Sequence, residues 1–136
     1  MKPKFYLFLL FSAIAFASCT KGVLDNRQSI VGSWEITSVE RQTPYGGQYE
    51  YTGYEDGTFY FKSNGSAEFS DRQGRMSGTW RTVQRADGTS LELRLYDNYR
   101  ERVIEWEFYS IQSNSSYMVG YMTRYGDDYK FEFRRY

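Results

Sequence analysis

The sequence predicts an all-β domain folded as an antiparallel up-and-down barrel of eight to nine strands. From Ile30 to the end of the chain, apolar and polar residues alternate with the period of two that strands require. Turn residues interrupt this alternation at intervals of roughly 8 to 12 positions, which is typical of sandwiches and barrels. No stretch of the same region repeats its apolar residues at helical spacing.

The first 18 residues have the three parts of a secretory signal peptide. Lys2 and Lys4 give a positive start, an apolar run covers 5–16, and the small residues Ala17 and Ser18 follow. The run is shorter than the roughly 20 residues that a membrane-spanning helix needs. We therefore expect residues 1–18 to be removed from the mature protein.

The sequence Phe16-Ala17-Ser18-Cys19 resembles the lipobox of bacterial lipoproteins, with Phe16 where an aliphatic residue is usual. The resemblance implies that Cys19 is lipidated and becomes the first residue, so that several acyl chains anchor the protein in a membrane. A plain signal peptide followed by an unmodified Cys is the alternative. Residues 19–29 are polar and read as a flexible tether. We expect a bacterial envelope protein, anchored in the outer membrane and facing the periplasm.

The first half of the domain contains four predicted strands. The strand 33–41 places Trp34, Ile36 and Ser38 on one face, and 48–54 is a polar, Tyr-rich strand. The segments 58–62 and 66–71 form a hairpin, because Asn64-Gly65 between them is the strongest short turn signal. Phe59, Phe61, Ala67 and Phe69 point inward from that hairpin.

The second half contains five predicted strands, over 75–84, 90–96, 102–112, 116–124 and 128–135. Four of them have a clear inner face, which carries Met76, Gly78, Trp80, Leu91, Leu93, Leu95, Ile104, Trp106, Phe108, Tyr129, Phe131 and Phe133. The strand 116–124 has two possible inner faces. One consists of Met118, Gly120 and Met122, and the other of Tyr117, Val119 and Tyr121.

A flat meander of this length would leave two open edges, and closure into a barrel removes them. A membrane-spanning barrel is excluded because the outer faces carry charges such as Glu92, Glu105 and Lys130, which are costly in lipid. A β-sandwich is the remaining structural alternative.

The segment Gly32-Ser33-Trp34 on the first strand resembles the G-x-W signature of the lipocalins. The runs VGSWEITSVE, GTFYFKSNGSAEF and GTW are similar to small bacterial lipocalin-like lipoproteins, over residues 30–136. The resemblance implies an eight-stranded barrel whose floor is closed by Arg135 packed over Trp34. It also implies a non-catalytic protein that binds a small apolar or amphipathic molecule inside the barrel.

Such a barrel is wide enough either to be filled by its own side chains or to hold one small ligand. Both outcomes remain open from the sequence. If a cavity exists, the expected lining is Trp34, Ile36, Phe59, Phe61, Trp80, Leu93, Trp106, Phe108 and Phe131.

A second candidate surface is the segment 44–57, which is rich in Tyr and Gly. Tyr45, Tyr49, Tyr51 and Tyr54 form either a lid over the barrel mouth or a rim of exposed rings. Exposed tyrosines suit a glycan or an envelope protein as partner. The alternative is that these rings only cover the solvent face of a strand.

Composition argues against several other functions. The 17 basic and 17 acidic residues balance, unlike in most nucleic-acid-binding proteins. The absence of His and the single Cys remove the common catalytic triads and the commonest zinc ligand, so we expect no metal, no cofactor and no enzymatic activity. Glu105 and Glu107 share a strand face, but on the solvated side, where surface ion pairs are expected rather than glycoside hydrolysis. An envelope hydrolase is the least favoured alternative.

Overall fold

The computed structural model describes residues 26–136. The predicted signal peptide 1–18, the lipidation of Cys19 and most of the tether lie outside the described residues. Within the described part, no helix is long and apolar enough to cross a membrane.

The described chain consists of one short helix followed by ten strands. They are α2 (Asn26–Ile30), β1 (Gly32–Thr43), β2 (Gly46–Tyr49), β3 (Thr58–Phe61), β4 (Ser66–Asp71), β5 (Gly74–Arg85), β6 (Gly88–Asp97), β7 (Arg102–Phe108), β8 (Ser110–Ser113), β9 (Tyr117–Arg124) and β10 (Asp127–Arg135). The all-β prediction is confirmed. The alternation of the sequence produces it, since residues of period two present one apolar face and one polar face.

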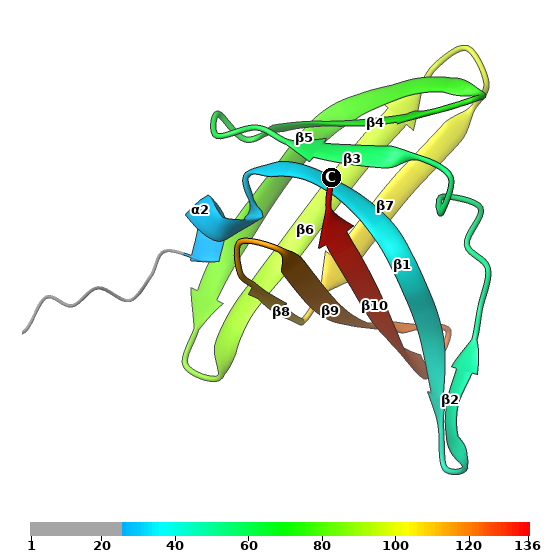
Figure 1. Cartoon of the computed structure of the whole chain (residues 1–136), viewed down its shortest axis with the longest axis vertical. Helices are drawn as coiled ribbons and strands as arrows, with labels where there is room; N and C mark the ends of the chain where they lie inside the picture. The colour runs from blue at the N-terminus through cyan, green and yellow to red at the C-terminus, as the bar shows by residue number, and fades with distance from the viewer. Residues whose placement is uncertain (1–25) are drawn as a thin grey trace, which may run out of the picture.

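All ten strands belong to one antiparallel sheet, with β2 as an extra strand beside β1. The strand order β7-β6-β5-β4-β3-β1-β10-β9-β8 follows the chain, except that β1 lies between β3 and β10. Figure 1 shows β3 to β7 on one side of the molecule and β1, β10, β9 and β8 on the other, so that the sheet curls around its apolar face.

The prediction of a closed barrel is wrong: the sheet ends at β7 and β8, and these two strands do not pair. They follow each other directly in the chain, through Tyr109. Where one long strand was expected over 102–112, the chain bends at Tyr109, and its second part pairs with β9. This bend lets the sheet wrap around its core without closing its ladder of hydrogen bonds.

The bulge at Thr37 corrects a second expectation. Ile36 is opposite Phe133, but the next pair is Ser38 with Glu132, so Thr37 is an extra residue in β1. The alternation therefore shifts by one position, and Val39 is buried in place of the half-buried Ser38. In β9 the interior set is Met118, Gly120 and Met122.

The helix α2 is the third difference, because residues 26–29 were expected to belong to a tether without structure. The Arg27 guanidinium stacks over the Trp80 ring at 5.2 Å and donates to the carbonyl of Ser63 at 3.1 Å. Ser29 and Ser113 share a hydrogen bond between their hydroxyls, and Ile30 is fully buried. Residues 26–29, at least, therefore belong to the folded domain, and α2 packs against one end of the sheet.

The floor of the molecule lies at that end. Arg135 is opposite Trp34 in the β1–β10 ladder, and its guanidinium lies 4.3 Å from the centre of the Trp34 ring. It also donates to the carbonyl oxygens of Val31 (2.9 Å) and Ser29 (2.7 Å). A side chain at Gly32 would overlap this guanidinium. The contact that the lipocalin resemblance implies between Arg135 and Trp34 is therefore present.

One apolar cluster fills the interior. It includes all three Trp and joins rings of β3 to β7 with rings of β10, as in the contacts of Phe59 with Phe133 (6.1 Å) and of Trp106 with Phe131 (5.1 Å). Gly78 and Gly120, two of the small inward residues, leave no space, since a Cβ at either would overlap neighbouring atoms. The core of the domain is packed with its own side chains.

Candidate ligand-binding cleft

A cleft opens where the sheet fails to close. The backbone N–H of Tyr109 donates to the carbonyl of Tyr121 at 2.9 Å, and Ser110 is the partner of the same residue. Beyond this point, residues 122–124 of β9 pair with β10 on one side only, and their other edge, like the free edge of β7, faces no partner strand within the described chain. The two strands diverge from Tyr109 and leave a wedge between them.

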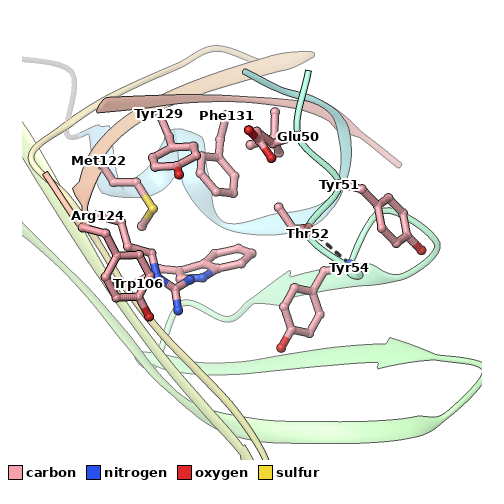
Figure 2. A pocket seen from close by; sticks show the side chains of 11 residues that line it. Glu50, Tyr51, Thr52, Tyr54, Trp106, Met122, Arg124, Tyr129 and Phe131 are labelled. Atoms are coloured by element: carbon pink, nitrogen blue, oxygen red, sulfur yellow. Dashed lines mark hydrogen bonds between the residues drawn. The ribbon is translucent and has the colours of Figure 1, made fainter. Parts of the chain in front are cut away.

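Two adjoining hollows occupy this wedge, with volumes of about 250 Å³ and 630 Å³. They share Thr52, Tyr54, Trp106, Met122 and Arg124. The smaller one, shown in Figure 2, also contacts Val39, Glu50, Tyr51, Tyr125, Tyr129 and Phe131. We call the two hollows together the seam cleft. Its size is within the range of small-molecule sites.

Aromatic and apolar side chains form the deep wall of the seam cleft. The Trp106 and Phe131 rings contact each other at 5.1 Å, and Met122 is almost fully buried beside them. Tyr54 closes another side, with its ring edge-on to Phe69 at 5.4 Å and to Trp106 at 5.6 Å. This wall offers a ligand apolar surface without a change in the core.

The segment 50–54 is held in place by hydrogen bonds rather than by strand pairing. The Glu55 carboxylate accepts from the backbone N–H and hydroxyl of Thr52 (2.7 and 3.0 Å) and from the N–H of Gly53 (2.9 Å). The N–H of Glu50 donates to the carbonyl of Val39 at 2.8 Å. These bonds fix the position of Tyr54 over the cleft.

The indole N–H groups of the three Trp differ in their partners. That of Trp34 donates to the carbonyl of Ile30 at 2.7 Å, and that of Trp80 to the carbonyl of Lys62 at 2.8 Å. The indole N–H of Trp106 has no acceptor among residues 26–136. It is also not one of the fully buried unpaired nitrogens, so this N–H is accessible and gives the seam cleft a donor that the described chain does not use.

Arg124 is the charged residue common to both hollows. It ends β9, and its side chain is directed toward the pocket in Figure 2. The guanidinium lies 5.1 Å from the centre of the Tyr125 ring and has no ion pair within the described chain. By contrast, Glu50 is paired with Arg41, at 3.3 Å between Oε1 and Nε.

The turn that follows Arg124 is unusual. Tyr125 and Gly126 have φ of 53° and 83°, so both lie in the left-handed region that a two-residue hairpin turn of this kind requires. Asn or Gly normally occupies the first position, because a bulky residue is strained there. The Tyr ring is nevertheless placed against Arg124 at the edge of the cleft.

The replacement Tyr125→Asn tests whether the strained Tyr125 contributes to ligand binding at the cleft. We expect the free energy of unfolding to rise by about 0.5 kcal/mol, since Asn tolerates the left-handed conformation. Ligand affinity at the cleft should fall, because one wall and the ring behind Arg124 are lost. Urea denaturation gives the first quantity and a binding titration gives the second. A variant that is less stable, or that binds as well as the wild type, would contradict this interpretation.

The structure separates the predicted interior residues into two groups. All nine are buried. Only Trp106 and Phe131 also line the seam cleft. The other seven are packed in the core and line neither hollow, and they are Trp34, Ile36, Phe59, Phe61, Trp80, Leu93 and Phe108.

The four tyrosines of the predicted rim also fall into two groups, outside the cleft and at the cleft. Tyr45 and Tyr49 are exposed, outside both hollows, while Tyr51 lines the smaller one and Tyr54 is half-buried against the core. Sequence reasoning missed Met122, Arg124 and Tyr129 as parts of one site. The one sequence feature that could have indicated this site is the position of Arg124, at the end of a predicted strand and directly before Tyr125-Gly126.

The carboxyls with displaced pKa values are not placed for acid catalysis. Hydrogen bonds from Arg81 and from Lys130 lower the pKa of Glu92 and of Glu132, so both stay ionised. A general acid needs the opposite shift. Glu105 and Glu107 are exposed, and Glu105 accepts a hydrogen bond from the Tyr96 hydroxyl at 3.0 Å.

The chain was compared with protein families, curated proteins and solved structures. No protein-family model matches the chain, and no curated protein does. Among solved structures, the chain is similar to a DUF4847 family protein from Bacteroides vulgatus, with a TM-score of 0.45 and 12% identity. The alignment covers 78% of this chain and 93% of that one. The lipocalin resemblance stays a prediction.

Proposed function

We propose that this protein binds a small amphipathic molecule in the seam cleft and performs no chemistry on it. The observation that supports the proposal is an accessible apolar wall next to unpaired donors, at the place where the sheet does not close. Ligand sites typically combine mostly apolar surface with a few polar groups that fix orientation. The sequence alone predicts a ligand inside a barrel. Because the core is packed with side chains, we place the proposed site at the open side of the sheet instead.

We further propose that the domain is held at a bacterial membrane by a lipid on Cys19, in the outer membrane and facing the periplasm. The helix α2 brings the chain to the floor beside Arg135. In β10, the cleft residue Tyr129 lies near the other end of the strand and Phe131 lies at its middle. A tether on α2 would therefore present the cleft away from the membrane surface.

Incorporation of labelled palmitate by the expressing bacterium tests the anchor. We expect label in the wild-type chain, recovery of the protein with membranes, and loss of both in Cys19→Ser. Label that persists in Cys19→Ser, or an unlabelled wild-type chain, would contradict the lipid anchor and leave the ligand proposal standing.

The fluorescent apolar amine N-phenyl-1-naphthylamine tests the ligand proposal. We expect saturable binding, weakened about tenfold by Tyr54→Ala, because this ring forms one wall of the cleft. Tyr99→Ala is the matched control, since Tyr99 is 99% exposed and lines neither hollow. Equal affinities of the two variants, or the absence of saturable binding, would contradict the proposal.

A second candidate function uses the Tyr-rich rim. The hairpin of β1 and β2 extends from the body of the domain in Figure 1, and Tyr45 and Tyr49 on it are 101% and 61% exposed. Rings presented in this way suit a glycan or an envelope protein. The double variant Tyr45→Ala/Tyr49→Ala separates the two functions, because it should abolish rim binding and leave dye binding in the cleft unchanged.

A further inference from the structure

We propose that the ligand of the seam cleft is an organic acid, whose anionic group is bound by the Arg124 guanidinium and the Trp106 indole N–H. This inference rests on the proposed function and adds the chemical class of the ligand. The apolar part of the molecule would lie against the Trp106–Phe131 wall.

The first argument is the set of unused donors. Every indole N–H in the described chain except that of Trp106 is bonded to a backbone carbonyl. The Arg124 guanidinium likewise has no hydrogen bond or ion pair with residues 26–136. Both side chains line both hollows. Arg124 is exposed at the mouth of the cleft and Trp106 lies deeper, so both donors are accessible to a ligand that supplies acceptor oxygens in place of water.

The second argument is the charge balance in the smaller hollow and the adjoining turn, where the carboxylates already have partners. Glu50 and Asp127 lie 3.3 and 3.9 Å from Arg41 nitrogens. The Thr123 hydroxyl donates to Asp128 at 2.6 Å.

The two β7 carboxylates of the larger hollow are on the solvated face of the strand. Tyr96 donates to Glu105, and Glu107 acts electrostatically on Arg81. Neither of these two carboxylates forms an ion pair within residues 26–136. In the smaller hollow, where Glu50 is already paired, Arg124 is the charge without a counter-ion in the described chain.

The third argument is how Arg124 is held. Its guanidinium lies over the Tyr125 ring, and Tyr125 occupies a left-handed turn position that normally favours Asn or Gly. Strained residues of this kind concentrate at ligand sites. A stacked guanidinium keeps its planar donor edge free for a carboxylate, which it binds with two parallel hydrogen bonds.

Two nearly isosteric probes test the inference, 2-naphthoate and its neutral amide 2-naphthamide. We expect the full-length protein to bind the acid about tenfold more tightly, which corresponds to about 1.4 kcal/mol of charge-assisted hydrogen bonding. Arg124→Met should remove this difference by weakening the acid and not the amide. Trp106→Phe, which keeps a ring and removes the donor, should weaken both.

The matched control is Arg75→Met, which removes the same charge from an exposed position on β5 that lines neither hollow. It should keep the preference for the acid. Equal binding of acid and amide by the wild type, or an unchanged preference in Arg124→Met, would overturn the inference and leave the proposed function intact. Binding of neither probe would overturn both.

Discussion

Replacing Arg102 by Met is expected to lower the free energy of unfolding by about 3 kcal/mol, one of the largest effects of a single substitution in this protein. Arg102 is only 14% exposed and joins two hairpins: its Nη1 lies 2.8 Å from Asp71 and its Nε 3.5 Å from Asp97. Burial lowers the pKa of Arg102, but the hydrogen bond and charge of Asp71, together with the charge of Asp97, outweigh burial and raise it. Without this cation, two carboxylates that are themselves only 9% and 7% exposed lose their ion-pair partner.

Urea denaturation of the full-length protein measures this effect. The triple variant Arg102→Met/Asp71→Asn/Asp97→Asn should recover part of the loss, because it removes the stranded charges as well as their partner. Arg75→Met provides the control for loss of one exposed Arg. A single variant as stable as this control would contradict the role of Arg102 as a buried link between the hairpins.

Replacing Trp34 by Ala is expected to cost about 4 kcal/mol and to loosen the floor of the domain. The substitution removes a fully buried ring, the hydrogen bond from its indole to Ile30, and the surface on which the Arg135 guanidinium stacks. The hydrogen bonds of Arg135 to Val31 and Ser29 then lose their support, so α2 should detach locally.

Trp34→Phe separates these contributions, because it keeps a ring under Arg135 and loses the indole hydrogen bond. We expect an intermediate stability, with amide hydrogen exchange in 26–31 faster than in the wild type and slower than in Trp34→Ala. Equal exchange rates in all three proteins would show that the floor does not depend on this residue.

The strands were predictable because the alternation of buried and exposed positions is local. The Leu91, Leu93 and Leu95 series, for example, is buried as the sequence indicates. Two features were not predictable. The bulge at Thr37 depends on the pairing of β1 with β10, and the bend at Tyr109 depends on how far the sheet curls. Neither property is visible in the period of a single strand.

The candidate site was predictable only in part for the same reason. Trp106 and Phe131 were expected to face the interior, and they do, but so do residues such as Phe59 that are sealed in the core. What distinguishes the cleft residues is their position beside the gap between β7 and the end of β9. From the sequence, Arg124 is an ordinary strand end. Its significance comes from the edge of residues 122–124 that faces away from β10 and has no partner strand in the described chain.

The indole signals of the three tryptophans in a ¹⁵N–¹H correlation spectrum test the location of the site most directly, because Trp34, Trp80 and Trp106 report on the two ends of the molecule. Trp34 and Trp80 have their N–H bonded at the end beside α2, while Trp106 lines the seam cleft. On titration with 2-naphthoate, we expect the Trp106 signal to shift and the other two to stay in place. Shifts of the Trp34 or Trp80 signals with an unmoved Trp106 signal would place the ligand inside the sheet and contradict the seam cleft as its site.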